Sequence, residues 1–156
     1  MEILYCSKWW FARKRPIEIL DETTACSNHI QGIDYSVVMS ESGKVYCILE
    51  MSLNDIFVNF MNADGEKYLT YAFHREKEED IFLNAAYYHN YENNTETEML
   101  IFGFKTNGQL CMEKRNLVNG AVEERESVVD VSCNWDKYPK FGDYSRLTVL
   151  ERELNL

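Results

Sequence analysis

Residues 56–75 read IFVNFMNADGEKYLTYAFHR and carry the clearest structural signal in the chain. Two runs rich in β-branched and aromatic residues flank the dipeptide Asp64-Gly65. A tight hairpin turn needs positive φ angles, which glycine adopts without steric cost. Because the connection is short, the two runs are predicted to pair as antiparallel strands.

The same combination of strand-like runs and glycine turns extends from about residue 33 to residue 131. Asn107-Gly108 and Asn119-Gly120 each separate two further runs. The runs predicted as strands are residues 45–51, 56–62, 67–75, 81–89, 98–106, 109–117 and 121–132. With about seven to nine strands, the sequence predicts a mainly β fold in which an antiparallel meander forms a curled sheet or a barrel-like domain, or else a two-layer sandwich.

Alternation of residue types indicates which side of each strand is buried. Leu69, Tyr71 and Phe73 fall on one face of their run, whereas Thr70 and His74 fall on the other. In residues 56–62 both faces are partly apolar. This pattern is typical of a curled sheet, of a barrel wall or of a sheet covered by another element.

The N-terminal region gives weaker patterns than the central meander. Residues 3–6 and 9–12 each have the composition of a short strand. Residues 21–31 lack a clean hydrophobic period and are therefore predicted to form a loop.

The C-terminal region holds two further features. Residues 133–143 are expected to form an irregular segment packed by its aromatic side chains. Leu147, Leu150 and Leu154 have the spacing of one face of a short C-terminal helix. The β-branched residues Thr148 and Val149 weaken that helix and leave a final strand as the alternative.

Length and composition are those of one soluble domain, residues 1–156. The chain has 46% hydrophobic residues and only two prolines, which excludes a disordered chain. Its first residues lack the pattern of a signal peptide, and no apolar run reaches the roughly 20 residues of a membrane span. The five cysteines include no Cys-x-x-Cys pair, so we expect reduced, mostly buried thiols and a cytoplasmic location. Cys6, Cys47 and Cys111 lie in apolar or strand-like runs.

Charge indicates the class of partner. The net charge is −10, so bare nucleic acid and anionic membranes would be repelled. Residues 8–15 mix aromatic and basic side chains, a composition that also occurs in nucleic-acid binding, but a first strand with tryptophans in the core is the favoured interpretation. The sequence therefore predicts a basic protein partner, with neither nucleic acid nor membrane bound.

Signatures of catalysis are missing from the sequence. It contains no Gly-x-Ser-x-Gly, no Ser-x-x-Lys and no phosphate-binding glycine loop. His29, His74 and His89 do not have the spacing of zinc ligands. We therefore expect no catalytic residue, no metal site and no cofactor, although two carboxylates brought together by folding remain an alternative.

Acidic residues gather in three clusters that we predict to bind the partner. Complementary charge speeds the encounter of two proteins and disfavours wrong partners. The predicted partner-binding residues are Glu76, Glu78, Glu79, Asp80, Glu92, Glu96, Glu98, Glu123, Glu124 and Glu126. Because successive hairpin turns alternate between the ends of a sheet, strand order decides whether these clusters converge.

This combination of small size, acidity, free cysteines, many Tyr and Trp and no catalytic signature resembles the immunity proteins of bacterial toxin systems, such as contact-dependent growth inhibition. The resemblance implies a cognate toxin domain, often a basic nuclease, that the protein binds and neutralises. The alternative function is that of a lipocalin-like β-barrel holding a small apolar ligand.

Overall fold

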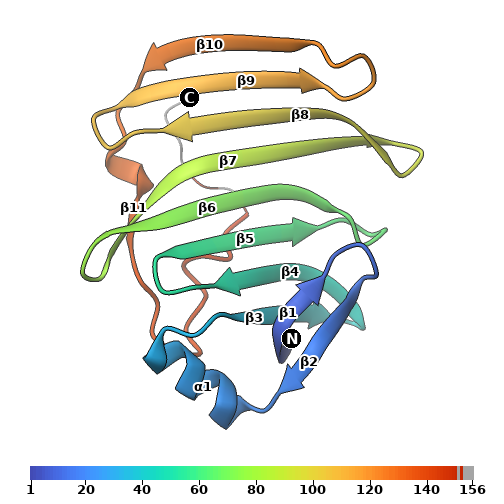
Figure 1. The fold of residues 1–156 in the computed structure, drawn as a ribbon, viewed down its shortest axis with the longest axis vertical. Coiled ribbons are helices and arrows are strands. Elements are labelled where there is room, and N and C mark those ends of the chain that lie inside the picture. The colour runs from blue at the N-terminus through green and yellow to red at the C-terminus, as the bar shows by residue number, and fades with distance from the viewer. Residues whose placement is uncertain (151, 153–156) are drawn as a thin grey trace.

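The computed structural model describes residues 1–150 and 152, and it shows one twisted antiparallel sheet (Figure 1). Along the sheet the strands lie in the order β10-β9-β8-β7-β6-β5-β4-β3-β1-β2, and β11 pairs with the start of β7. The strands are β1 (Glu2–Trp10), β2 (Arg15–Leu20), β3 (Tyr35–Glu41), β4 (Lys44–Met51), β5 (Asp55–Met61), β6 (Lys67–Lys77), β7 (Asp80–Glu92), β8 (Thr95–Phe104), β9 (Gln109–Asn116), β10 (Val122–Val128) and β11 (Trp135–Lys137). The helices are α1 (Glu22–Gln31) and the 3-10 turn η1 (Ser132–Asn134).

The predicted mainly β meander is confirmed, and it forms a curled sheet that does not close into a barrel. Strands β10 and β2 are its two edges. The sheet has 11 strands, more than predicted, because β2, β3 and β11 were missed. Strand β3 is buried on both faces and so lacks alternation. Strand β2 contains Pro16 and a positive φ of 53° at Glu18.

The tightest hairpin turns are not those of the Asp-Gly and Asn-Gly pairs. Two-residue turns occur at Ser42-Gly43, with φ of 51° and 76°, and at Asn93-Asn94, with φ of 50° and 64°. Positive φ at both positions matches the right-handed twist of the paired strands. Asp64-Gly65 and the two Asn-Gly pairs do lie in hairpin connections, but these connections are longer than two residues.

Gly108 is the turn glycine that tolerates a side chain least. It has φ of 93°, and a Cβ there would lie 2.7 Å from the carbonyl oxygen of Val129. Gly120 has a similar φ of 77° but no neighbouring atom within 4 Å. We expect Gly108→Ala to lower the free energy of unfolding by about 1–3 kcal/mol more than Gly120→Ala does. Urea unfolding of both variants measures the difference, and equal losses would mean that backbone angle alone matters.

Residues 21–31, predicted to be a loop, form α1, so that prediction was wrong. Asp21 caps the helix by accepting a 2.7 Å hydrogen bond from the Thr24 backbone N–H. Gly32 ends it in the left-handed conformation, with φ of 71°. These two caps were visible in the sequence. They specify the helix even though its apolar face is weak, because only Ala25 is buried.

The main core lies on one face of the sheet, called here the core face. Its buried residues come chiefly from β3 to β7 and include Val37, Leu49, Val58 and Phe73. The C-terminal segment crosses this face behind the strands in Figure 1 and buries Tyr144 and Leu147 against it.

The expectations for the C-terminal region had mixed outcomes. Residues 133–143 are largely irregular and aromatic-packed, as expected, with β11 as a short exception. The predicted C-terminal helix does not form over residues 147–150. Leu147 is buried, Leu150 is 43% exposed, and Leu154 lies outside the described residues.

His29 couples the packing of α1 to pH. Its Nδ1 lies 2.7 Å from the Tyr35 hydroxyl. Burial lowers the pKa of His29 below its ordinary value of 6.5, and Arg75 adds to this, while a backbone hydrogen bond at Pro139 and the charge of Glu79 oppose it. The unfolded chain therefore binds a proton at His29 more readily than the folded protein does. The contribution of His29 to the free energy of unfolding is full above pH 6.5 and falls as the pH drops below it.

We expect His29→Gln to reduce the loss of stability at acid pH. Urea unfolding above and below the ordinary histidine pKa of 6.5 measures the free energy of unfolding of both proteins. His74→Gln is the control, because the His74 side chain is 44% exposed. An unchanged pH slope in His29→Gln would contradict the assignment.

Candidate protein-binding face

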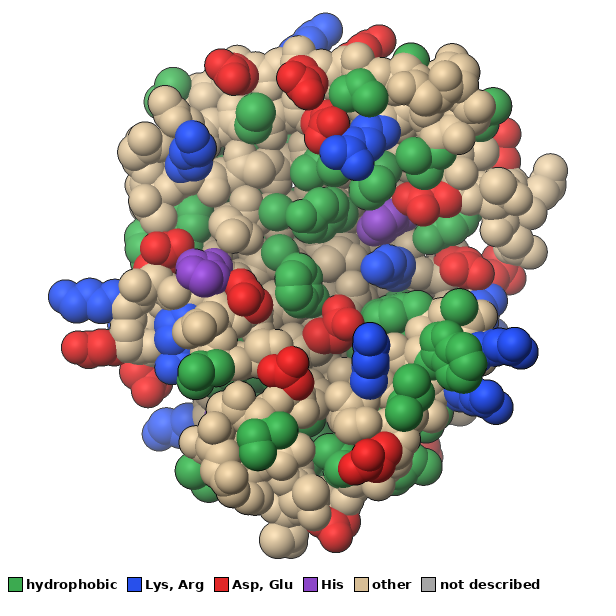
Figure 2. All heavy atoms as spheres, in the orientation of Figure 1, with side chains coloured by type: hydrophobic (Ala, Val, Ile, Leu, Met, Phe, Trp, Pro, Cys, Tyr) green, Lys and Arg blue, Asp and Glu red, His purple; other side chains and the backbone are tan. Residues whose placement is uncertain are grey.

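The second face of the sheet, called here the open face, lies opposite the core face. Figure 2 shows hydrophobic side chains in its recessed middle and charged and histidine side chains around them. Hairpin β1–β2 packs Trp9 over one end, against Val38, Ile48 and Met61. The strand register assigns to this face Glu50, Phe57, Asn59, Thr70, Ala72, Ala85, Tyr87, Met99, Ile101, Gly103, Cys111, Glu113, Arg115, Glu124 and Glu126.

One row of paired residues crosses the open face from β4 to β10. In order it contains Glu50, Phe57, Ala72, Ala85, Gly103, Cys111 and Glu126. Small residues occupy its middle, on β6, β7 and β8. Larger side chains stand at both ends, including Phe57, which is 37% exposed. The middle of the row is therefore a shallow strip of the surface, and an acidic residue stands at each end of it.

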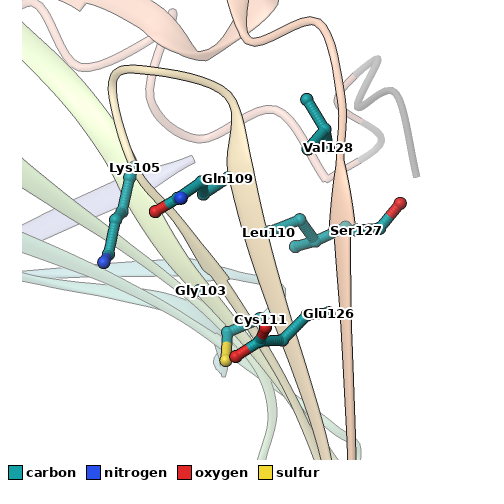
Figure 3. A pocket seen from close by; sticks show the side chains of 8 residues that line it. All are labelled: Gly103, Lys105, Gln109, Leu110, Cys111, Glu126, Ser127 and Val128. Atoms are coloured by element: carbon teal, nitrogen blue, oxygen red, sulfur yellow. The ribbon is translucent and has the colours of Figure 1, made fainter.

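A pocket of about 350 Å³ lies at the β10 end of this row. Figure 3 shows the side chains of Cys111 and Glu126 close together on neighbouring strands, with Lys105 and Gln109 farther along, toward the β8–β9 turn. Gly103 contributes no side chain, which keeps the floor of the pocket low. The pocket thus presents one carboxylate, one ammonium group and one thiol.

A chain of buried polar groups lies at the other end of the row. Thr70 Oγ1 donates to Asn59 Oδ1 at 2.9 Å, and Asn59 Nδ2 donates to Glu50 Oε2 at 3.1 Å and to the Ile48 carbonyl at 3.2 Å. Asn59 and Thr70 are only 1% and 5% exposed. Buried polar groups are costly unless they are hydrogen-bonded. This chain satisfies both residues and fixes the carboxylate of Glu50.

Three other acids near the open face have a side-chain partner within the protein. His74 Nδ1 lies 2.8 Å from Asp55, and His89 Nδ1 lies 2.6 Å from Glu96. Arg115 donates from Nε to Glu113 at 2.9 Å, and this hydrogen bond raises the pKa of the arginine. Within residues 1–150 and 152, no such ion pair involves Glu50, Glu124 or Glu126.

The ten predicted partner-binding acids do not form one surface. Residues 76–80 lie at the β6–β7 turn, at the opposite end of the sheet from the β7–β8 and β9–β10 turns. The second and third clusters do come close, because the Leu117 N–H donates to the Thr97 carbonyl at 2.9 Å. Strand order thus separates the first cluster from the other two.

The individual acids also differ in which way they face. Glu124 and Glu126 lie on the open face. Glu96 contacts His89, which lies on the same face. Glu98 and Glu123 lie on the core face. Some are already neutralised within the protein. Asp80 pairs with Lys137, and Glu98 pairs with Lys114 at 3.5 Å. The residues at turn β6–β7 are Glu76, Glu78, Glu79 and Asp80, and Glu92 ends β7 beside the next turn.

Sequence reasoning missed Glu50, Phe57, Asn59 and Thr70. A signal was present, since Asn59 and Thr70 are polar residues inside otherwise apolar strand runs. Only the register shows that they are neighbours, and only the folded structure shows that their hydrogen bonds lead to Glu50.

The cysteines differ in burial according to where they lie on the sheet. Cys6 and Cys47 are buried, and burial raises the pKa of their thiols to about 11 and about 12. Cys111 was expected among the buried thiols but is exposed, because β9 presents it on the open face. All five cysteines are free.

Neither a metal site nor a membrane helix stands out in the described part of the chain. No group of three His, Cys, Asp or Glu side chains there could hold a metal ion. Among the same residues, no helix is long and apolar enough to cross a membrane. A scan against protein-family models, a search of curated proteins and a search of solved structures each found no match to this chain.

Proposed function

We propose that this protein binds a basic protein domain on the open face and neutralises it, in the manner of an immunity protein acting on a nuclease-type toxin. The observation that carries the proposal is the open face itself. It combines exposed apolar side chains with Glu50, Glu124 and Glu126, which form no ion pair with a described residue. Such a surface is complementary to a positively charged partner.

The mechanism follows from what a basic nuclease uses to hold its substrate. Lys and Arg side chains that bind phosphate would instead pair with the acids of the open face. Phe57 and Tyr87 supply aromatic anchors, the residue class that dominates interface energy. The net charge of −10 adds long-range attraction that speeds association.

The alternative of a small apolar ligand inside a lipocalin-like barrel has less support. That function requires a lumen enclosed by strands. Here β10 and β2 are separate edges of one sheet, so the strands do not enclose such a lumen. We therefore propose protein binding alone.

Capture from the native host followed by reconstitution tests the proposal. The full-length protein is used as bait, and the captured protein is then purified and mixed with it. We expect an equimolar complex with a basic protein whose own activity is lost in the complex. A partner that is acidic, or that stays fully active when bound, would contradict the proposal.

A further inference from the structure

We infer that Glu50 and Phe57 form a subsite for one arginine side chain of the protein partner. The inference rests on the proposed function and names the contact at its centre. The two residues are paired across β4 and β5 on the open face. A guanidinium group hydrogen-bonds a carboxylate and stacks on an aromatic ring, and a lysine ammonium group does the second less well.

The state of the Glu50 carboxylate is the first argument. Its Oε2 accepts from Asn59 at 3.1 Å, whereas Oε1 has no hydrogen-bond partner among the described residues. Two other acids of the open face have partners within the protein: Glu113 pairs with Arg115, and Asp55 lies beside His74. Glu50 is therefore oriented by a neutral donor and forms no ion pair with a described residue, so an external cation would supply its counter-charge.

The buried support beneath Glu50 is the second argument. Asn59 and Thr70 lie almost fully buried in the central strands, and together they hold one carboxylate oxygen in place. A fully satisfied polar network is rigid, and a rigid site loses less entropy when a ligand binds. The arrangement thus preorganises the carboxylate for a contact at its free oxygen.

The neighbourhood of Glu50 is the third argument. Phe57 is 37% exposed beside it, and the next residues of the row are Ala72 and Ala85. These small side chains leave room for the backbone of an extended segment. An arginine from such a segment would lie with its guanidinium between the carboxylate and the ring.

Nuclear magnetic resonance titration of the full-length protein with capped hexa-arginine tests the subsite. The reporters are the Asn59 side-chain amide and the Phe57 ring. We expect both to shift saturably, and Glu50→Gln to weaken binding about tenfold, because a charge-assisted hydrogen bond becomes a neutral one. Glutamine still offers Asn59 an oxygen acceptor, so the buried network and the fold are retained.

Matched controls separate the subsite from overall charge. Glu79→Gln removes the same charge at the β6–β7 turn, outside the proposed subsite, and should change binding by less than about twofold. Phe57→Ala should weaken it about threefold through loss of the cation–π contact. Hexa-citrulline, which is uncharged, should cause no shift, and hexa-lysine should bind more weakly than hexa-arginine.

Several results would overturn the inference. Equal weakening by Glu50→Gln and Glu79→Gln would mean attraction by net charge only. Hexa-lysine binding as tightly as hexa-arginine would contradict an arginine subsite. Free arginine amide binding as tightly as the peptide would indicate a small-cation site in place of a protein contact.

The outcome can be told apart from failure of the proposed function. If the captured partner binds Glu50→Gln as tightly as the wild type, the subsite fails and the binding function stands. If hexa-arginine binds through Glu50 but the captured protein stays active in the complex, the neutralising function fails and the subsite stands.

Discussion

Replacing Asp136 with alanine is expected to lower the free energy of unfolding by about 3 kcal/mol. The Asp136 side chain is 4% exposed and accepts from Arg146 at 2.9 Å and from Arg152 at 3.2 Å. The Arg152 side chain is itself only 10% exposed and lies over the Phe73 ring. Removing the carboxylate leaves that guanidinium buried without its counter-charge. The free-energy penalty of this unpaired charge exceeds the net stabilisation that the intact ion pair provides.

Asp80→Ala is the matched control for this prediction. Asp80 also pairs with a residue of β11, Lys137, but the two side chains are 42% and 71% exposed. Exposed ion pairs contribute less than about 1 kcal/mol. Urea unfolding of both variants measures the contrast. Equal losses would show that the C-terminal segment is held to the core face by apolar packing and that the buried ion pair adds little.

Reversing Glu124 and Glu126 to lysine is expected to slow association with the basic partner about tenfold at low salt, because electrostatic steering depends on charge at the docking surface. Both residues lie on β10, whose side chains are exposed along its whole length. Stopped-flow mixing with the captured partner measures the rate. The difference from the wild type should shrink at high salt, since ions screen exposed charges.

The sequence alone also predicts slower association after reversal of Glu78, Glu79 and Asp80. That cluster lies at the opposite end of the sheet from the β9–β10 turn, and Asp80 is already paired with Lys137. We therefore expect this triple variant to slow association less than the β10 variant. A larger effect from the triple variant would move the docking surface to the β6–β7 turn.

Much of the fold was predictable because hairpin meanders are marked locally. Glycine turns and alternating runs predicted most strands of β4 to β10 to within a few residues. The break in the pattern around Glu78 marks the β6–β7 turn, across which His74 pairs with Phe82. Elements without such marks were missed, namely the fully buried β3 and the weakly amphipathic α1.

The site was less predictable, because it depends on register across many strands. A bulge shifts pairing between Ala72 and Phe73, so Leu83 lies on the core face while Ala85 and Tyr87 lie on the open face. Strict alternation would have put all three on one side. A single inserted residue exchanges the two faces of a strand. Sequence reasoning therefore found the acidity but not which acids share a surface.

Hydroxyl-radical footprinting of the protein, free and in complex with the captured partner, tests the central claim most directly. Met99 lies on the open face, paired with Arg115, and Met112 lies on the opposite face, paired with Phe102. Methionine is readily oxidised when accessible. We predict that the complex protects Met99 and Phe57 and leaves Met112 unchanged. Unchanged oxidation of Met99 and Phe57, with protection confined to the β6–β7 turn or to Met112, would contradict binding at the open face.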